Sequence, residues 1–171
     1  MDELERLSAT EAMQAAKNPL ILILDDVRSM HNVGAAFRTA DAFGISAVYL
    51  CGYTPTPPHR DIRKTALGAE DSVAWQHFEQ VSDAIAAARA QDYHIYAVEQ
   101  VHNSRSLESL AWHGASATAF IFGNEVSGVS DAALALADEC LEIPQYGSKH
   151  SLNVSVSMGV VLWEAVRKGN I

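Results

Sequence analysis

Residues 20–24, Leu-Ile-Leu-Ile-Leu, form an unbroken apolar run, and this run most constrains the fold. A strand with one face in water alternates apolar and polar residues, whereas an unbroken run is typical of a strand buried on both faces. Such strands belong to parallel sheets with helices packed on both sides. We therefore expect an α/β domain with a mostly parallel sheet flanked by helices.

The rest of the chain alternates between strand and helix patterns, as this fold requires. Residues 2–17 have a weak amphipathic pattern that predicts a helix ending before Pro19, and the Pro-rich stretch 52–58 is predicted to be irregular. Further strands are predicted at 46–51, 72–75, 93–98, 118–122 and 140–143, and helices at 32–43, 81–91 and 131–137. The length of 171 residues suits a single domain.

Residues 153–168 fit two patterns. Apolar residues at every second position from Val154 to Leu162 favour a strand. The length of the segment, Asn153 as a cap, and the basic pair Arg167-Lys168 before Gly169 favour a helix. The helix is the favoured interpretation, and the strand remains an alternative.

Composition excludes several classes of protein. Apolar residues make up 49% of the chain, which argues against disorder. No apolar run approaches the roughly 20 residues that span a bilayer, and the acidic N-terminus is unlike a signal peptide, so we expect a cytoplasmic protein. Cys51 and Cys140 each end an apolar run and are expected to be buried free thiols.

The formal net charge of −9 argues against nucleic-acid binding through bulk charge. It still allows a local basic site, because the basic residues cluster in a few loops while the acids lie elsewhere. The alternative is an ordinary acidic enzyme with scattered surface bases. The clustered residues are Arg28, His31, Arg38, His59, Arg60, Arg63, Lys64, Lys149 and His150.

Polar loops follow four predicted strands, at 25–32, 99–104, 123–128 and 144–152. In an open α/β sheet, ligands bind outside the carboxyl ends of the strands, so these loops are expected to form one site. The phosphate-binding glycine patterns of nucleotide-binding proteins are absent, and the histidines have no metal-ligand spacing.

Each candidate in these loops also fits a purely structural role. Arg38 could form a surface ion pair with Asp41, three residues later on the same helix. Glu125 could cap the helix that follows it, and Ser151 and Asn153 could cap the last helix.

Together, the motifs resemble those of the SpoU/TrmH branch of the SPOUT RNA methyltransferases. The resemblance covers about residues 20–168, and three ordered motifs are far more specific than any one alone. They are Asn32-Val33-Gly34 with Arg38 and Gly44, then Gly123-Asn124-Glu125 with Gly128, and then Ile143-Pro144 with Gly147 and Ser151-Leu152-Asn153. The segment Lys64 to Ala69 is also similar to that family.

The resemblance implies transfer of a methyl group from S-adenosylmethionine, without a metal, to a ribose 2′-hydroxyl of RNA. It implies a homodimer and a C-terminal trefoil knot, and it favours a helix for residues 153–168. The domain would be one unit over 1–171, with an N-terminal helix in 1–18 and a knotted core in 20–168. The compact chain favours transfer RNA over ribosomal RNA as the partner.

The resemblance also assigns roles to residues. The donor would be bound near Val98, Glu99, Gly123, Ile143 and Leu152. The catalytic set would be Asn32, Arg38, Glu125, Ser151 and Asn153. The other clustered bases would contact RNA, namely Arg28, His31, Arg60, Arg63, Lys64, Lys149 and His150.

Two other functions remain open at this point. One is a module that binds the donor and RNA without transferring methyl groups, which the intact Arg38, Glu125 and Asn153 argue against. The other is a methyltransferase for a small nucleotide, which the acidic charge would tolerate.

Overall fold

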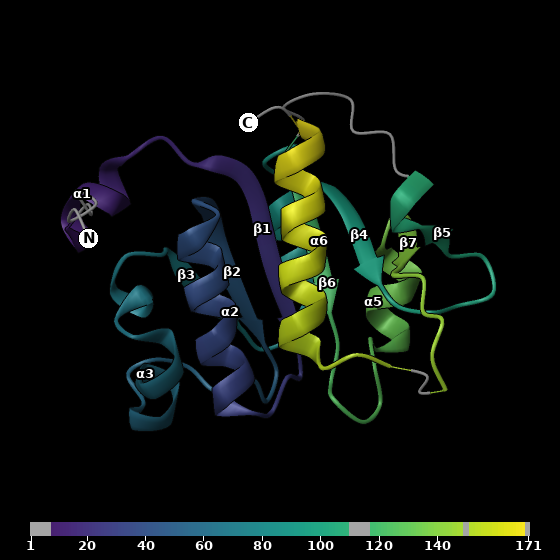
Figure 1. The fold of residues 1–171 in the computed structure, drawn as a ribbon, viewed down its shortest axis with the longest axis horizontal. Helices are drawn as coiled ribbons and strands as arrows, with labels where there is room; N and C mark the ends of the chain where they lie inside the picture. The colour runs from purple at the N-terminus through teal and green to yellow at the C-terminus, as the bar shows by residue number, and fades with distance from the viewer. Residues whose placement is uncertain (1–7, 110–116, 149–150, 170–171) are drawn as a thin grey trace.

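The computed structural model describes residues 8–109, 117–148 and 151–169. Seven strands form one sheet in the order β3-β2-β1-β6-β4-β7-β5, and each neighbouring pair is parallel (Figure 1). The strands are β1 (Asn18–Asp25), β2 (Ile45–Cys51), β3 (Trp75–Phe78), β4 (His94–Val98), β5 (Arg105–Ser106), β6 (Thr118–Phe122) and β7 (Glu139–Glu142). The α/β class with a parallel sheet is confirmed.

Helices cover both faces of the sheet. They are α1 (Ala9–Gln14), α2 (Met30–Ala42), α3 (Arg60–Ala66), α4 (Val81–Arg89), α5 (Asp131–Leu136) and α6 (Val154–Gly169), with 3-10 turns at Ala69–Asp71 and Leu107–Ser109. Residues of α2, α3 and α6 share one hydrophobic core, and residues of α4 and α5 share another. The sheet therefore separates two cores.

The apolar run in β1 supplies both cores. Leu20, Leu22 and Leu24 pack with α2 and α6, while Ile21 and Ile23 pack with α4 and α5. All five side chains are at most 2% exposed. The burial on both faces predicted from the unbroken run is confirmed, because successive side chains of a strand point to opposite faces.

The last segment is the helix α6, and the alternative strand interpretation of residues 153–168 is wrong. The side chains of Met158, Val161, Leu162 and Ala165 are buried. Their spacing of three, one and three residues places them on one side of a helix, facing the core that α6 shares with α2. Packing of this stripe overrides the alternating pattern.

Other boundaries differ from the predictions. The strand expected at 72–75 lies at 75–78, because Ser72 and Val73 are held in a turn by the carbonyl of Ala69. The two-residue strand β5 was not predicted. The predicted N-terminal helix is seen at 9–14, five residues before Pro19, and residues 1–7 lie outside the described residues.

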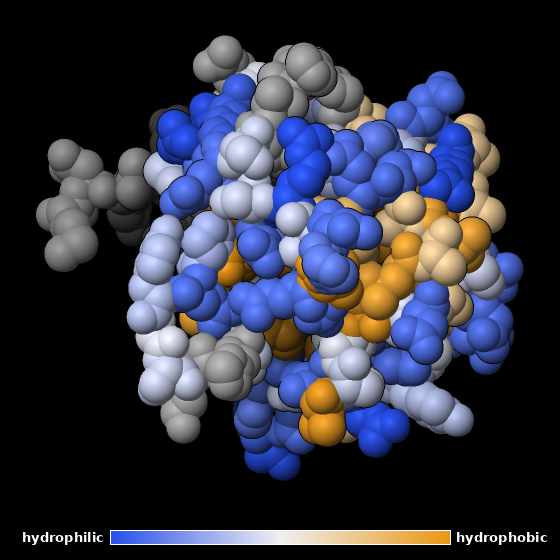
Figure 2. Space-filling model, turned by 90° about the vertical axis from the view of Figure 1, so that its right-hand side faces the viewer, coloured by the Kyte–Doolittle hydropathy of each residue, from blue (hydrophilic) through white to orange (hydrophobic). Residues whose placement is uncertain are grey.

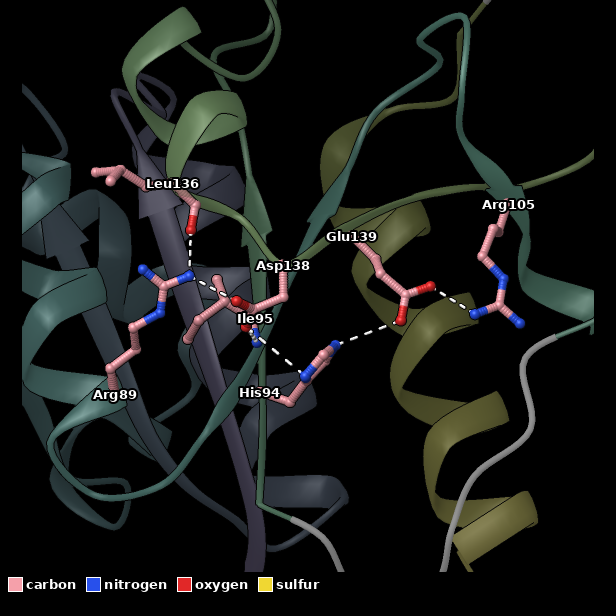
Figure 3. Close-up of polar contacts among 7 residues, drawn as sticks. All are labelled: Arg89, His94, Ile95, Arg105, Leu136, Asp138 and Glu139. Carbon is pink, nitrogen blue, oxygen red and sulfur yellow. Dashed lines mark hydrogen bonds and ion pairs between the residues drawn. The ribbon is translucent and has the colours of Figure 1, made fainter.

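Charged residues join the strands at the amino end of the sheet (Figure 3). Asp138 accepts hydrogen bonds from the Arg89 guanidinium and from the backbone N–H of Ile95. His94 Nδ1 lies 3.7 Å from Asp138, and His94 Nε2 lies 3.5 Å from Glu139, which Arg105 also binds. This network connects α4, β4, β7 and β5 at the end opposite the predicted ligand loops.

The two cysteines are free thiols, as predicted. Cys51 is buried, and burial together with nearby carboxylates raises the pKa of its thiol to about 12. Cys140 is only partly buried, so the prediction of burial holds for Cys51 alone.

The outer surface shows no apolar belt on the face seen in Figure 2. This face, on the side of β5 and β7, is mostly hydrophilic, with hydrophobic residues that reach from its centre to the right-hand edge of the view (Figure 2). None of the helices in the described ranges combines the length and apolar character needed to cross a membrane.

The contact between α2 and α3 gives a first prediction. A Cβ atom at Gly34 would lie 2.0 Å from Thr65 Oγ1 and 2.4 Å from the Ile62 carbonyl oxygen. Alanine usually stabilises a helix over glycine by about 0.5–1 kcal/mol, but overpacking against backbone typically costs about 1–3 kcal/mol. We expect Gly34→Ala to lower the free energy of unfolding, measured by urea denaturation.

The double variant Gly34→Ala/Thr65→Ala separates the two contacts. It removes the hydroxyl collision but keeps the collision with the Ile62 carbonyl, so it should recover only part of the loss. A Gly34→Ala protein as stable as the wild type would show that α3 moves away at no cost.

Candidate active site

A cavity of about 650 Å³ opens at the carboxyl end of the sheet. It lies among the loops that follow β4, β6 and β7 and the start of α6, so three of the four loops predicted to form one site meet there. The fourth predicted loop, 25–32, does not line the cavity. Its walls combine apolar side chains with exposed backbone and polar groups. They include Val98, Glu99, Gly123, Ile143 and Leu152, together with Glu125, Ser151 and Asn153.

Glu99 closes one wall of the cavity. Its carboxylate accepts hydrogen bonds from the backbone N–H of Val129 at 3.0 Å and of Gln100 at 3.0 Å. Gly128 has φ +72°, and a Cβ atom there would lie 2.3 Å from Glu99 Oε2. Gly123 packs equally tightly, since its Cβ would lie 2.1 Å from the Gly128 carbonyl carbon. Glycine at 123 and 128 thus lets the loop fold back on itself.

Glu125 binds the N-terminus of α2. Its carboxylate accepts hydrogen bonds from the backbone N–H of Arg28 and of Ser29, both at 3.0 Å, and from Asn32 Nδ2 at 2.9 Å. The first N–H groups of a helix have no partner within the helix, and a carboxylate there also interacts favourably with the helix dipole. The structural role that the sequence suggested, a cap on the following helix, is wrong: Ser130 caps α5.

Asn153 connects α6 to this cluster. Its side-chain oxygen accepts a hydrogen bond from the backbone N–H of Ser155 at 2.9 Å, so it caps α6 as predicted. Its amide nitrogen donates to Asn32 Oδ1 at 3.3 Å. Asn32, Glu125 and Asn153, from three distant segments, therefore form one hydrogen-bonded chain.

The hydrogen bonds to Glu125 set its protonation. Burial acts to raise the pKa of this carboxyl, but the hydrogen bonds donated by Arg28, Asn32 and Ser29 outweigh burial and hold the pKa below its ordinary value. The carboxylate is therefore ionised near neutral pH, with its oxygens already engaged.

The two remaining residues of the predicted catalytic set, Arg38 and Ser151, differ in their position relative to the cavity. Ser151 is exposed and lines the cavity. Arg38 is exposed on α2, outside the residues that line the cavity. The suggested ion pair between Arg38 and Asp41 is not formed; Asp41 accepts a hydrogen bond from the Ser72 hydroxyl instead. The guanidinium of Arg38 is thus available to a ligand at the surface.

The predicted basic cluster is partly neutralised. Arg63 is paired with Glu70 and Asp71, and Lys64 with Asp61. Arg28, His31 and Arg60 are exposed, and within the described ranges no ion pair to an acid is formed by these three. Lys149 and His150 lie outside the described residues.

Asn124 is a structural member of the site that the sequence analysis did not single out. Its side-chain oxygen accepts hydrogen bonds from the N–H groups of Val126 and Ser127, and its amide donates to the Asp26 carbonyl at 2.8 Å. An Asn that follows a glycine at the end of a strand, in a short polar loop, is a signal for such a turn. Among the described residues, no group of acidic, His and Cys side chains is suited to hold a metal.

Known proteins of one family match almost the whole chain. Residues 19–163 match the model of the SpoU rRNA Methylase family. A tRNA (guanosine(18)-2′-O)-methyltransferase of Thermus thermophilus is 31% identical over 166 residues, which are 97% of this chain and 84% of that protein. A 23S rRNA (guanosine-2′-O-)-methyltransferase, RlmB, of Haemophilus ducreyi is 32% identical over 166 residues, covering 97% and 67%.

A solved structure agrees with the fold. The AdoMet-bound rRNA methyltransferase from Sinorhizobium meliloti superposes with a TM-score of 0.81 at 26% identity. The match covers 91% of this chain but 59% of that one, so the relative carries additional sequence.

The Glu125 cluster gives a prediction for pH dependence. A carboxyl whose pKa is lowered on folding stabilises the fold above its ordinary pKa of 4.5, and this stabilisation is lost as the pH falls through the folded-state pKa. Glu125→Gln keeps one acceptor oxygen but loses the charge. Because Glu125 is exposed to solvent, which screens its charge, we expect the free energy of unfolding to fall by only about 0.5–1 kcal/mol at pH 7.

Denaturant unfolding of both proteins from pH 7 to pH 3 tests this. The difference between wild type and Glu125→Gln should shrink below about pH 4.5, the ordinary value. A difference that is constant over this range would mean that the charge of Glu125 does not stabilise α2.

Proposed function

The chain belongs to the SpoU rRNA methylase family, and from this we propose that it transfers a methyl group from S-adenosylmethionine to a ribose 2′-hydroxyl of RNA. One observation carries the proposal. The cavity at the carboxyl end of the sheet is joined through Asn153, Asn32 and Glu125 to the start of α2, the helix that bears Arg38. A donor site and a cationic surface are thus built on one hydrogen-bonded unit.

The cavity suits the donor. Its volume of about 650 Å³ lies within the range of roughly 300–1,000 Å³ typical of small-molecule sites. Val98, Ile143 and Leu152 line the cavity and are assigned to the adenine ring, and Gly123 lines it beside them. Bound there, the sulfonium of S-adenosylmethionine supplies an activated methyl group, so the protein's main task is to position the two reactants.

We assign to Arg38 the binding of the RNA phosphate and the stabilisation of negative charge on the 2′-oxygen. A guanidinium does not readily lose its proton in proteins, so it is poorly suited to act as a base. Its planar donors instead bind a phosphate with two hydrogen bonds and favour a developing alkoxide. The exposed position of Arg38 supports this assignment.

Glu125, Asn32 and Asn153 have positioning roles in this proposal. Three hydrogen bonds already reach the Glu125 carboxylate and hold its pKa low, which disfavours proton acceptance. The cluster instead keeps the start of α2 against the cavity. Ser151, which lines the cavity, is assigned to the ribose or the donor.

Transfer RNA is the favoured substrate in our proposal. The relatives described above include enzymes named for tRNA and for rRNA, so family membership leaves both open. The match covers 84% of the tRNA enzyme of Thermus thermophilus and 67% of the rRNA enzyme of Haemophilus ducreyi, which favours transfer RNA. Arg28, His31 and Arg60 are assigned to its phosphates, with Lys149 and His150 as expected additions; Arg63 and Lys64 contribute less because acids already pair with them.

We also propose that the protein is a homodimer of one-domain chains in the cytoplasm, with the chain after β7 passing through a loop to form a trefoil knot. The exposed face of α6 supports the dimer, because Val156, Val160 and Trp163 are 38–58% exposed on one side of the helix. The return of the chain from β7 to α6 beside α2 supports the knot (Figure 1). A chain trace in electron density with α6 outside every loop would contradict it.

Methyl transfer from labelled S-adenosylmethionine to unmodified tRNA and rRNA, followed by digestion, tests the reaction. Label on a ribose 2′-oxygen is expected. Donor binding without transfer to either RNA would favour the silent binding module, and transfer to free nucleotides alone would favour a small-molecule substrate.

Arg38→Ala should lower kcat by about 100-fold or more while the calorimetric Kd of the donor stays within about twofold. The reason is that Arg38 lies outside the cavity lining. Arg38→Lys keeps the charge but not the paired donors, and it should have an intermediate kcat. Equal losses of donor affinity and turnover in Arg38→Ala would refute the assignment.

Val160→Glu should convert the dimer into a monomer, because it places a charge on the apolar face of α6. Light scattering of the wild type should give twice the chain mass of 18.5 kDa. Met13→Glu, at an exposed apolar residue on α1, is the matched control and should remain dimeric. A monomeric wild type would rule out the proposed interface.

A further inference from the structure

Tyr53 is exposed at the same end of the sheet as the cavity. It follows β2, and its side chain is 79% exposed. Since β2 pairs with β1 and β1 pairs with β6, the loop of Tyr53 lies beside the loops that carry Arg28 and Glu125. Neighbouring strands are about 4.8 Å apart, so the ring lies within a few strand spacings of the Glu125 cluster.

The backbone beneath Tyr53 is firmly held. Its N–H donates to Asp26 Oδ1 at 2.7 Å, and the hydroxyl of Thr54 donates to the buried Leu24 carbonyl at 3.1 Å. Gly52 has φ +59°, and a Cβ atom there would lie 2.2 Å from Asp26 Oδ1. The loop therefore fixes the backbone of Tyr53 while its aromatic ring stays in solvent.

Arg28 connects the ring to the proposed catalytic cluster. Its guanidinium carbon lies 5.9 Å from the centre of the Tyr53 ring, close to the outer limit of about 6 Å for cation–π contacts. Its backbone N–H donates to the Glu125 carboxylate. Arg28 thus leaves most of the ring accessible. Tyr53, Arg28 and the Glu125 cluster follow one another along the carboxyl end of the sheet.

The net negative charge of the protein gives such a ring a role in RNA binding. A net charge of −9 opposes RNA binding through long-range attraction, and Arg63 and Lys64 are paired with acids. Unpaired bases stack on aromatic side chains, and this contact does not depend on charge. Affinity for RNA therefore requires a contribution other than phosphate contacts, and an exposed, anchored tyrosine supplies one.

We propose that Tyr53 is a stacking platform for an unpaired RNA base beside the methylated nucleotide, with the Arg28 guanidinium on the phosphate between them. The inference rests on the proposed RNA methyltransferase function and adds a binding subsite to it. The preferred RNA is accordingly one whose target nucleotide lies in a loop with a neighbouring base free to leave its stack.

The test compares Tyr53→Ala, Tyr53→Leu and Tyr53→Trp with the wild type. We would measure kcat and KM for in-vitro-transcribed, unmodified tRNA, the Kd of the same RNA by filter binding at several salt concentrations, and the donor Kd by calorimetry. Trp75→Ala is the matched control, because Trp75 is an exposed aromatic residue at the start of β3 and lies at the other end of the sheet.

Tyr53→Ala and Tyr53→Leu should raise the KM and Kd for RNA by about tenfold or more, with kcat at saturating RNA and donor Kd nearly unchanged. Tyr53→Trp should restore both, and Trp75→Ala should have no effect. The dependence of Kd on salt should keep its slope in Tyr53→Ala, whereas Arg60→Gln should reduce that slope.

Unchanged RNA affinity in Tyr53→Ala, or a Tyr53→Leu protein equal to the wild type, would overturn the proposal. Failure of the proposed function is distinguishable, because a wild type that binds tRNA without methylating it still reports stacking through the Kd values. A wild type that binds neither donor nor RNA would overturn both.

Discussion

The carboxylate of Glu125 is the point on which the geometry of the candidate active site depends. It accepts hydrogen bonds from the backbone N–H groups of Arg28 and Ser29, directly before α2, although Arg28 is 97 residues away in the chain. Asn32 extends the contact to Asn153, which in turn caps α6. The starts of two core helices and the loop after β6 are therefore oriented together, and α2 carries Arg38 at a defined angle to the cavity.

Patterns within a few residues predicted most of this fold. The run at Leu20–Leu24 identified a strand between two helical layers, and Asn153 was recognised as a cap. The partner of Glu125 was not predictable in this way, because no local pattern links residues 28 and 125. Strand β5 has only two residues, too few for a periodic signal. The motif resemblance identified the cavity residues, since it carries information about distant segments that periodicity lacks.

The pairing of basic residues with acids was predicted less well than the fold. The basic residues were predicted to cluster in a few loops with the acids elsewhere, but the ion pairs of Arg63 with Glu70 and Asp71 depend on how α3 packs onto the turn after it. The pair between Lys64 and Asp61 has the three-residue spacing of a helical pair, but it was not predicted, because the sequence analysis did not identify α3 as a helix. An acidic protein that must hold a polyanion then depends on a few unpaired cations and on uncharged contacts.

The ion-pair network in Figure 3 has an evolutionary consequence. It joins the amino ends of β4 and β7, while the loops that form the cavity leave their carboxyl ends. A substitution in one of the cavity loops therefore leaves the strand register intact. Related proteins can share this sheet and still act on different RNAs. The loops at the carboxyl end can therefore change the RNA that is recognised without altering the contacts that hold the strands together at the amino end.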